Sequence, residues 1–113
     1  MKKLLKPYII IDSARGILEV CLSYVLHKDD GWYLAECPEL RLMDQGRTKR
    51  AAIENLFDMA DASLSEAYQT KNIDAMLKEL GFRKSTTQKR KKYISSNKAF
   101  ENMHPLKLTV RLI

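Results

Sequence analysis

The sequence predicts an α+β fold in which a curved antiparallel sheet of three to five strands packs on one long and one short helix. Residues 18–26 alternate apolar and polar side chains, which is the period of a half-buried strand. Asp30-Gly31 then separates this run from a second β-rich run. Residues 49–68 instead space their apolar side chains three and four positions apart, as an amphipathic helix does. The predicted element order is β-β-β-α-α-β.

The first two predicted strands form a hairpin. Asp30 and Gly31 suit a two-residue turn because both turn positions need a positive φ angle. The return strand covers residues 32–37 and is stopped by Pro38, which cannot donate to a strand ladder. Asp30 and Gly31 are therefore predicted to have a structural role as turn residues.

This turn fixes the predicted register, with Lys28 opposite Tyr33. Strand alternation then separates a core face from an outer face. The core face is predicted to carry Leu18, Val20, Leu22, Tyr24, Leu26, Tyr33, Ala35 and Cys37. Cys21 is predicted on the outer face, so it cannot form a disulfide with Cys37 within one chain. Trp32 and Leu34 share the outer face and are candidate partner-binding residues.

The next elements are a short third strand at residues 40–44 and the long helix at 49–68. Gly46 permits a tight strand-to-helix turn, and Thr48 is placed to cap the helix by accepting from a free amide. A shorter helix is predicted from Asn72 to a glycine cap at Gly81.

The ends of the chain are predicted to add strands. Residues 8–11 indicate an extra strand, and residues 106–113 alternate with a clear two-residue period. The intervening segment, at about 83–105, is predicted to be an exposed basic connection to the C-terminal strand, because residues 83–92 contain no apolar side chain. The whole chain, 1–113, is predicted to be one domain.

Charge is unevenly distributed along the chain. Residues 1–82 hold 11 basic and 13 acidic side chains, whereas residues 83–113 hold 9 basic and 1 acidic. A basic cluster of this kind gains affinity for nucleic acid by releasing phosphate counterions, although a solubilising linker is the plainer interpretation. The candidate nucleic-acid-binding residues are Arg83, Lys84, Lys89, Arg90, Lys91 and Lys92.

Composition argues against several other classes of protein. His27 and His104 lie far apart without a cluster of ligands beside them, so we expect no metal site and no cofactor. No constellation of nucleophile and base is visible, and we expect no enzyme activity. No apolar run is long enough to cross a membrane. Lys6 and Pro7 interrupt the signal-like start, which makes the cytoplasm the expected compartment.

Four pieces of sequence resemble the HicB antitoxin-like family. They are Asp30-Gly31-Trp32-Tyr33-Leu34-Ala35-Glu36, Pro38-Glu39-Leu40, Gly46-Arg47-Thr48 and Ala52-Ile53-Glu54-Asn55-Leu56, at the spacing expected of that family. The resemblance covers about residues 18–80, and the final strand matches short, single-domain members. It departs from the family at Ala51, where Glu is usual, and at Leu42, where Gly is frequent.

The resemblance implies a reduced RNase H-like fold with no nuclease centre. It also implies an antitoxin of a type II toxin-antitoxin system, which neutralises a small basic HicA-type mRNA-cleaving toxin by protein-protein binding. An acidic helix face would suit such a partner, and its residues are Asp58, Asp61 and Glu66. A solvated helix face is the plainer interpretation.

Two alternatives stay open: a nucleic-acid-binding module that uses residues 83–92, and an orphan HicB-like protein without a toxin. Self-association, as a homodimer or larger assembly, is expected because sheet edges are usually paired or covered.

Overall fold

The computed structural model describes residues 6–85, 90–96 and 103–112. Within these residues the chain forms one antiparallel sheet and two helices, so the predicted α+β class is confirmed, with seven strands in place of three to five. The elements are β1 (Tyr8–Asp12), β2 (Ile17–Asp29), β3 (Trp32–Cys37), β4 (Leu42–Gly46), α1 (Lys49–Gln69), α2 (Ile73–Glu79), β5 (Phe82–Ser85), β6 (Lys91–Ser95) and β7 (His104–Arg111).

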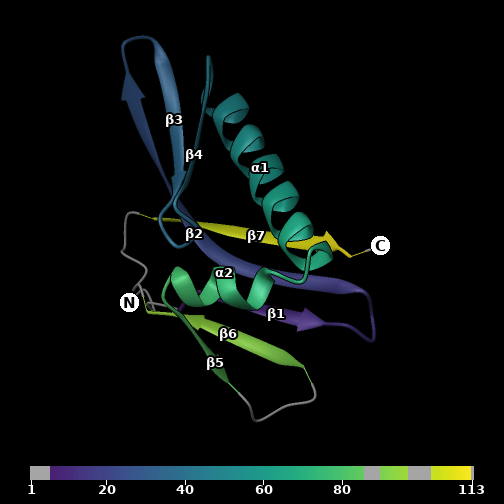
Figure 1. The fold of residues 1–113 in the computed structure, drawn as a ribbon. Coiled ribbons are helices and arrows are strands. Elements are labelled where there is room, and N and C mark those ends of the chain that lie inside the picture. The colour runs from purple at the N-terminus through teal and green to yellow at the C-terminus, as the bar shows by residue number, and fades with distance from the viewer. Residues whose placement is uncertain (1–5, 86–89, 97–102, 113) are drawn as a thin grey trace.

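Strand β2 organises the sheet because it pairs with three other strands. Its first part pairs with β1 and with β7, and its second part pairs with β3. The change of partner falls between Tyr24, which pairs with β7, and Val25, which pairs with β3. The strand order is β4-β3-β2-β1-β6-β5, with β7 added against β2. In Figure 1 the β2–β3–β4 meander extends from the rest of the sheet as an arm beside α1.

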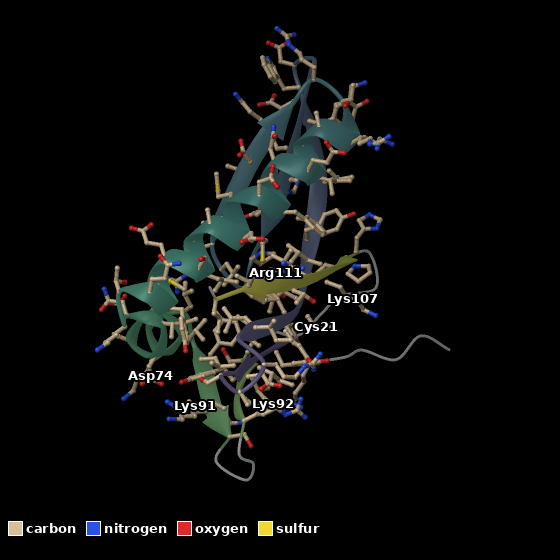
Figure 2. All side chains as sticks on the ribbon, turned by 90° about the vertical axis from the view of Figure 1, so that its right-hand side faces the viewer. Cys21, Asp74, Lys91, Lys92, Lys107 and Arg111 are labelled. Carbon is tan, nitrogen blue, oxygen red and sulfur yellow. The ribbon has the colours of Figure 1, made fainter. Side chains whose placement is uncertain are left out.

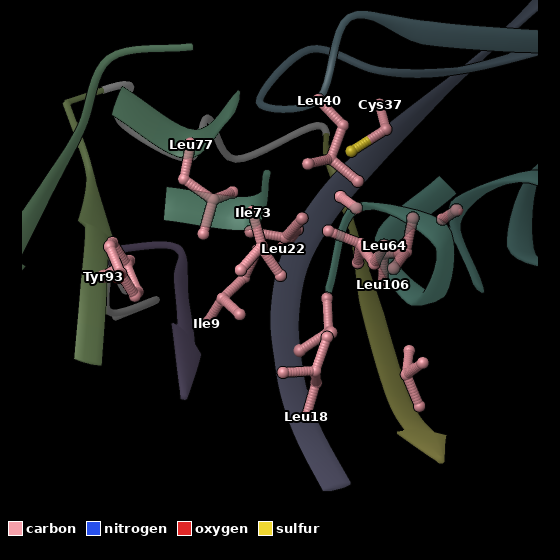
Figure 3. Packing of buried hydrophobic residues seen from close by; sticks show 14 of the residues in the cluster. Ile9, Leu18, Leu22, Cys37, Leu40, Leu64, Ile73, Leu77, Tyr93 and Leu106 are labelled. Atoms are coloured by element: carbon pink, nitrogen blue, oxygen red, sulfur yellow. The ribbon is translucent and has the colours of Figure 1, made fainter. Parts of the chain in front are cut away.

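The two helices cover the sheet and close a single hydrophobic core. Helix α1 contacts β4, β3 and β7, while α2 contacts β5 and α1. The apolar stripe of α1 is buried at Ala52, Leu56, Ala60, Leu64 and Ala67, as its spacing predicts. Figure 3 shows side chains from both helices and from the central strands meeting in this core. No helix in the described part of the chain has the length and apolarity needed to span a membrane.

The predicted hairpin is confirmed in its turn and its register. Asp30 and Gly31 have φ angles of 47° and 83°, and Lys28 pairs with Tyr33. The residues predicted on the core face are buried or packed against the core. The third strand begins at Leu42, later than predicted, because the chain first turns at Arg41 with a φ of 54°.

The junction between β4 and α1 is also built as predicted. The Thr48 hydroxyl accepts from the Ala51 amide at 3.0 Å, which confirms the helix cap. A Cβ atom at Gly46 would lie 2.5 Å from the Ala52 nitrogen, closer than real Cβ contacts come. Gly46 is therefore needed where the strand passes directly under the start of the helix.

The predicted exposed connection at 83–105 is wrong over part of its length. β5 and β6 pair with each other, and β6 also pairs with β1, so this segment extends the sheet. Phe82 and Tyr93 anchor the hairpin because both are buried. Charged residues are frequent in natural edge strands, where they discourage pairing with other chains. Residues 86–89 and 97–102 lie outside the described part.

Candidate functional site

The structure divides the basic cluster predicted at residues 83–92 between two faces of the sheet. In β6, Lys91 pairs with the buried Ile11 and shares its helix-side face, whereas Lys92 faces the opposite way. In β5 the same alternation places Lys84 on the helix side and Arg83 on the other. Figure 2 shows Lys91 on the side of Asp74 and Lys92 on the side of Cys21. The predicted cluster is therefore not one patch.

The remaining two members of that cluster, Lys89 and Arg90, precede β6 in the sequence. Arg90 is exposed immediately before the strand, and Lys89 lies outside the described residues.

We call the side of β5, β6, β1, β2 and β7 that is turned away from the helices the outer sheet face. The paired registers place one row of side chains across all five strands, with Cys21 between Tyr8 and Lys107. A second row places Glu19 between Ile10 and Thr109. The basic residues that alternation assigns to this face are Arg83, Lys92, Lys107 and Arg111.

A shallow groove of about 660 Å³ crosses the middle of the outer sheet face. It is lined by Lys6, Tyr8, Glu19, Cys21, Lys92, Lys107 and Thr109, among others. The Lys92 ammonium lies 4.7 Å from the centre of the Tyr8 ring, within cation–π range. The neighbouring Cys21 thiol has the largest effect in raising the pKa of the Tyr8 hydroxyl, followed by burial and by the Glu19 carboxylate. The groove thus joins an aromatic ring to cationic side chains.

The opposite side of the molecule carries the predicted acidic helix face. Asp58 and Glu66 are exposed on α1 and Asp61 is half-buried, and we call these three residues the acidic stripe. No ion pair to any of them is found within the described ranges. A second groove of about 520 Å³ runs between α1 and α2, and Glu66 and Glu79 both line it. Glu66 therefore belongs to both the acidic stripe and this groove, and Glu79 adds a second carboxylate to the groove.

Trp32 and Leu34 lie on the outer side of the β2–β3–β4 arm, as predicted, but neither is fully exposed. The Arg47 guanidinium lies 4.0 Å from the centre of the Trp32 ring and covers it. Met43 on neighbouring β4 is 53% exposed and is the large apolar side chain most open to solvent on this side of the arm.

Asp74 and Tyr93 form a polar contact that sequence reasoning missed. The Tyr93 hydroxyl donates to the Asp74 carboxylate and so links β6 to α2. This hydrogen bond, assisted by the positive charges of Lys84 and Lys91, lowers the pKa of Asp74. Burial, and then Asp74 itself, raise the pKa of the Tyr93 hydroxyl far above its usual value. On the helix side, the positive charges of Lys84 and Lys91 therefore favour the ionised form of Asp74.

The two cysteines in the described residues differ in burial. No group of three or more potential metal ligands occurs in these ranges. Cys37 is buried, and burial raises its thiol pKa to about 12, which leaves it a protonated thiol at neutral pH. Cys21 is half-buried on the outer sheet face.

Comparison with protein-family profiles, with curated proteins and with solved structures found no match. The surfaces therefore have to be interpreted from their own chemistry and from the sequence motifs. The alternation of residues 106–113 already implied that Lys107 and Arg111 share a face. Nothing in the sequence indicated which strand would lie beside them.

Proposed function

We propose that this chain is a HicB-like antitoxin that neutralises a small, basic HicA-type mRNA-cleaving toxin by protein-protein binding. The observation that carries the proposal is that the four motifs of the resemblance fold into one continuous unit. Asp30-Gly31 closes the β2–β3 hairpin, Pro38-Glu39-Leu40 connects β3 to β4, and Gly46 meets the first turn of α1. Each motif has a structural task within the same meander and helix.

The acidic stripe is the surface we assign to the toxin. Asp58, Asp61 and Glu66 project from the half of α1 that faces away from its buried stripe. The adjoining groove offers Glu66 and Glu79 above the half-buried Met76, so it suits the aliphatic stem and the charged head of an arginine or lysine. Complementary charge of this kind accelerates association and selects the partner.

The proposal is tested by co-expression with the product of the neighbouring reading frame. An antitoxin relieves the growth arrest that the toxin causes and co-purifies with it. The variant Asp58→Lys/Asp61→Lys should bind the toxin at least tenfold more weakly, because it places positive charge against a basic partner. Full rescue and unchanged affinity in this variant would refute the assignment of the acidic stripe.

Asp29→Lys is the matched control. Asp29 is also exposed, but it stands at the tip of the β2–β3 hairpin opposite Trp32. Asp29→Lys changes the net charge by +2 without touching α1, as each of the single substitutions Asp58→Lys and Asp61→Lys does on α1, and we expect toxin binding to be kept. If the neighbouring product neither arrests growth nor binds, the orphan alternative replaces the antitoxin proposal.

Self-association as a homodimer stays a prediction. The sheet ends at short strands, β4 on the arm and β5 at the far side, and such edges are usually paired or covered. In the single chain β7 pairs with β2 of the same chain, so closing the sheet needs no exchange of this strand. Sedimentation equilibrium of the purified protein checks the oligomeric state.

A further inference from the structure

We propose that the outer sheet face is a binding surface for single-stranded nucleic acid, held mainly through its phosphates. This inference does not depend on the antitoxin proposal, because it uses the opposite side of the molecule. It also differs from a basic tail binding by itself, because it excludes Lys84 and Lys91 and recruits Lys107 and Arg111 from β7.

Charge is the first argument. Four basic side chains, Arg83, Lys92, Lys107 and Arg111, project from one face, and three of them are exposed while Lys92 is half-buried. Two acids share this face: Glu19, which is paired with Arg15 at 3.4 Å, and Asp12, which is buried at the end of β1. Four basic side chains against two acidic ones leave the face with a positive excess, which attracts a polyanion and steers its approach.

The arrangement of those charges is the second argument. Arg83 and Lys92 stand on β5 and β6, at one margin, while Lys107 and Arg111 stand on β7, at the other. Four strand spacings separate β5 from β7, or about 19 Å, which is room for several nucleotides. Between the margins lie Tyr8, Ile10, Cys21 and other half-buried side chains. Bases can rest on these side chains while phosphates reach the margins.

The shape of the face argues for a single strand over a duplex. Reading a duplex requires an element that enters a groove, such as a helix or a protruding ribbon. The outer sheet face presents instead a broad surface with a shallow groove of about 660 Å³. On such a surface unstacked bases can lie against the sheet while basic side chains contact the phosphate backbone, as in other sheets that bind single strands.

The decisive experiment compares two double variants in binding to fluorescently labelled single-stranded oligonucleotides, one of RNA and one of DNA. Lys92→Gln/Lys107→Gln removes two charges from the outer sheet face. Lys84→Gln/Lys91→Gln removes two charges from the helix side of the same hairpin. Both variants change the net charge equally, so a difference between them reports position. Circular dichroism of each variant verifies that it is folded.

Salt dependence makes the expected result quantitative. Four phosphate contacts on a single strand give a slope of log affinity against log salt of about −2.8, so binding weakens about 50-fold between 50 and 200 mM salt. The outer-face variant should weaken only about 7-fold over that range, from a lower starting affinity. The helix-side variant should behave as the wild type. Absence of wild-type binding at low salt, or equal losses in both variants, would overturn the proposal.

Cys21 supplies a second readout that is independent of charge. It lies in the middle of the proposed surface, whereas Cys37 is buried in the core and serves as an internal control. Bound oligonucleotide should slow the alkylation of Cys21 by iodoacetamide and leave Cys37 unmodified throughout. Self-association could also protect Cys21 in the free protein. If oligonucleotide does not dissociate that assembly, the outer sheet face binds a second copy of the chain and the proposal fails.

Discussion

The buried Glu39 carboxylate accepts hydrogen bonds from both the backbone amide and the hydroxyl of Ser23. One carboxylate oxygen lies 3.1 Å from the Ser23 nitrogen, the other accepts from the hydroxyl, and the Cys37 thiol adds a contact at 3.5 Å. Ser23 stands directly before the point where β2 exchanges β7 for β3 as its partner, and its own partner in β7 is Pro105. Glu39 thus satisfies polar groups of β2 at a change of partner in the sheet.

We predict that Glu39→Ala lowers the free energy of unfolding by about 3 kcal/mol. The substitution leaves the Ser23 amide without its acceptor in a buried place, and hydrogen bonds to charged groups contribute about 1.5–3 kcal/mol. Urea unfolding followed by circular dichroism measures the change. Glu36→Ala is the matched control, because Glu36 is partly exposed and pairs only with His27 on the surface. Equal losses in the two variants would show that the Ser23 contact is not what stabilises the fold.

We predict that Gly46→Ala destabilises the protein more than Gly31→Ala. At Gly46 the new Cβ would meet backbone atoms of Ala51 and Ala52 at 2.8 Å and 2.5 Å, so the strand and helix must separate. Overpacking of this kind costs about 1–3 kcal/mol. At Gly31 nothing lies within 4 Å, and the cost of about 1 kcal/mol comes from its positive φ alone. Thermal unfolding of both variants ranks them, and the opposite ranking would contradict the close approach at Gly46.

Much of this arm could be predicted from sequence because its signals are local. The hairpin register follows from two turn residues and strand alternation, and the Thr48 cap follows from its place before the helix. Glu39 could not be predicted as buried, since glutamate is rarely inside and its partner Ser23 is 16 positions away. Its burial depends on the path of the chain after Pro38, which no local pattern encodes.

The β5–β6 hairpin could not be predicted either, and for a related reason. The helix-side face of β6 carries Lys91, Tyr93 and Ser95, and Tyr93 is the one apolar side chain among them. One apolar residue is too few to show the two-residue apolar period of a strand. The pairing of β6 with β1 joins residues that are 80 to 86 positions apart in sequence. A charged edge strand and an exposed linker have the same composition. The division of the basic residues between two faces, on which the nucleic-acid proposal rests, became visible only through that pairing.

Acid should weaken the link between α2 and β6. The folded pKa of Asp74 is depressed below its ordinary value of 3.8, first by the hydrogen bond from Tyr93. Its contribution to stability is therefore present above pH 3.8 and is lost as the pH falls below that value through the folded pKa. Carboxyl NMR titration should show Asp74 titrating below 3.8 in the wild type and moving upward in Tyr93→Phe. An identical Asp74 titration in the two proteins would exclude the hydroxyl as the main cause.

Trp32 offers a direct test of whether Arg47 covers the outer side of the arm. It is the only tryptophan in the chain, so its fluorescence reports this position alone. Arg47→Ala removes the guanidinium that covers the ring, and we expect a red-shifted emission and faster acrylamide quenching, with a loss of stability of about 0.5–1 kcal/mol. Lys49→Ala, two positions further on and also exposed, is the control that should leave the emission unchanged. If Arg47→Ala leaves the emission unaltered, Arg47 does not cover the ring in solution. Trp32 would then be accessible to a partner without any rearrangement of Arg47.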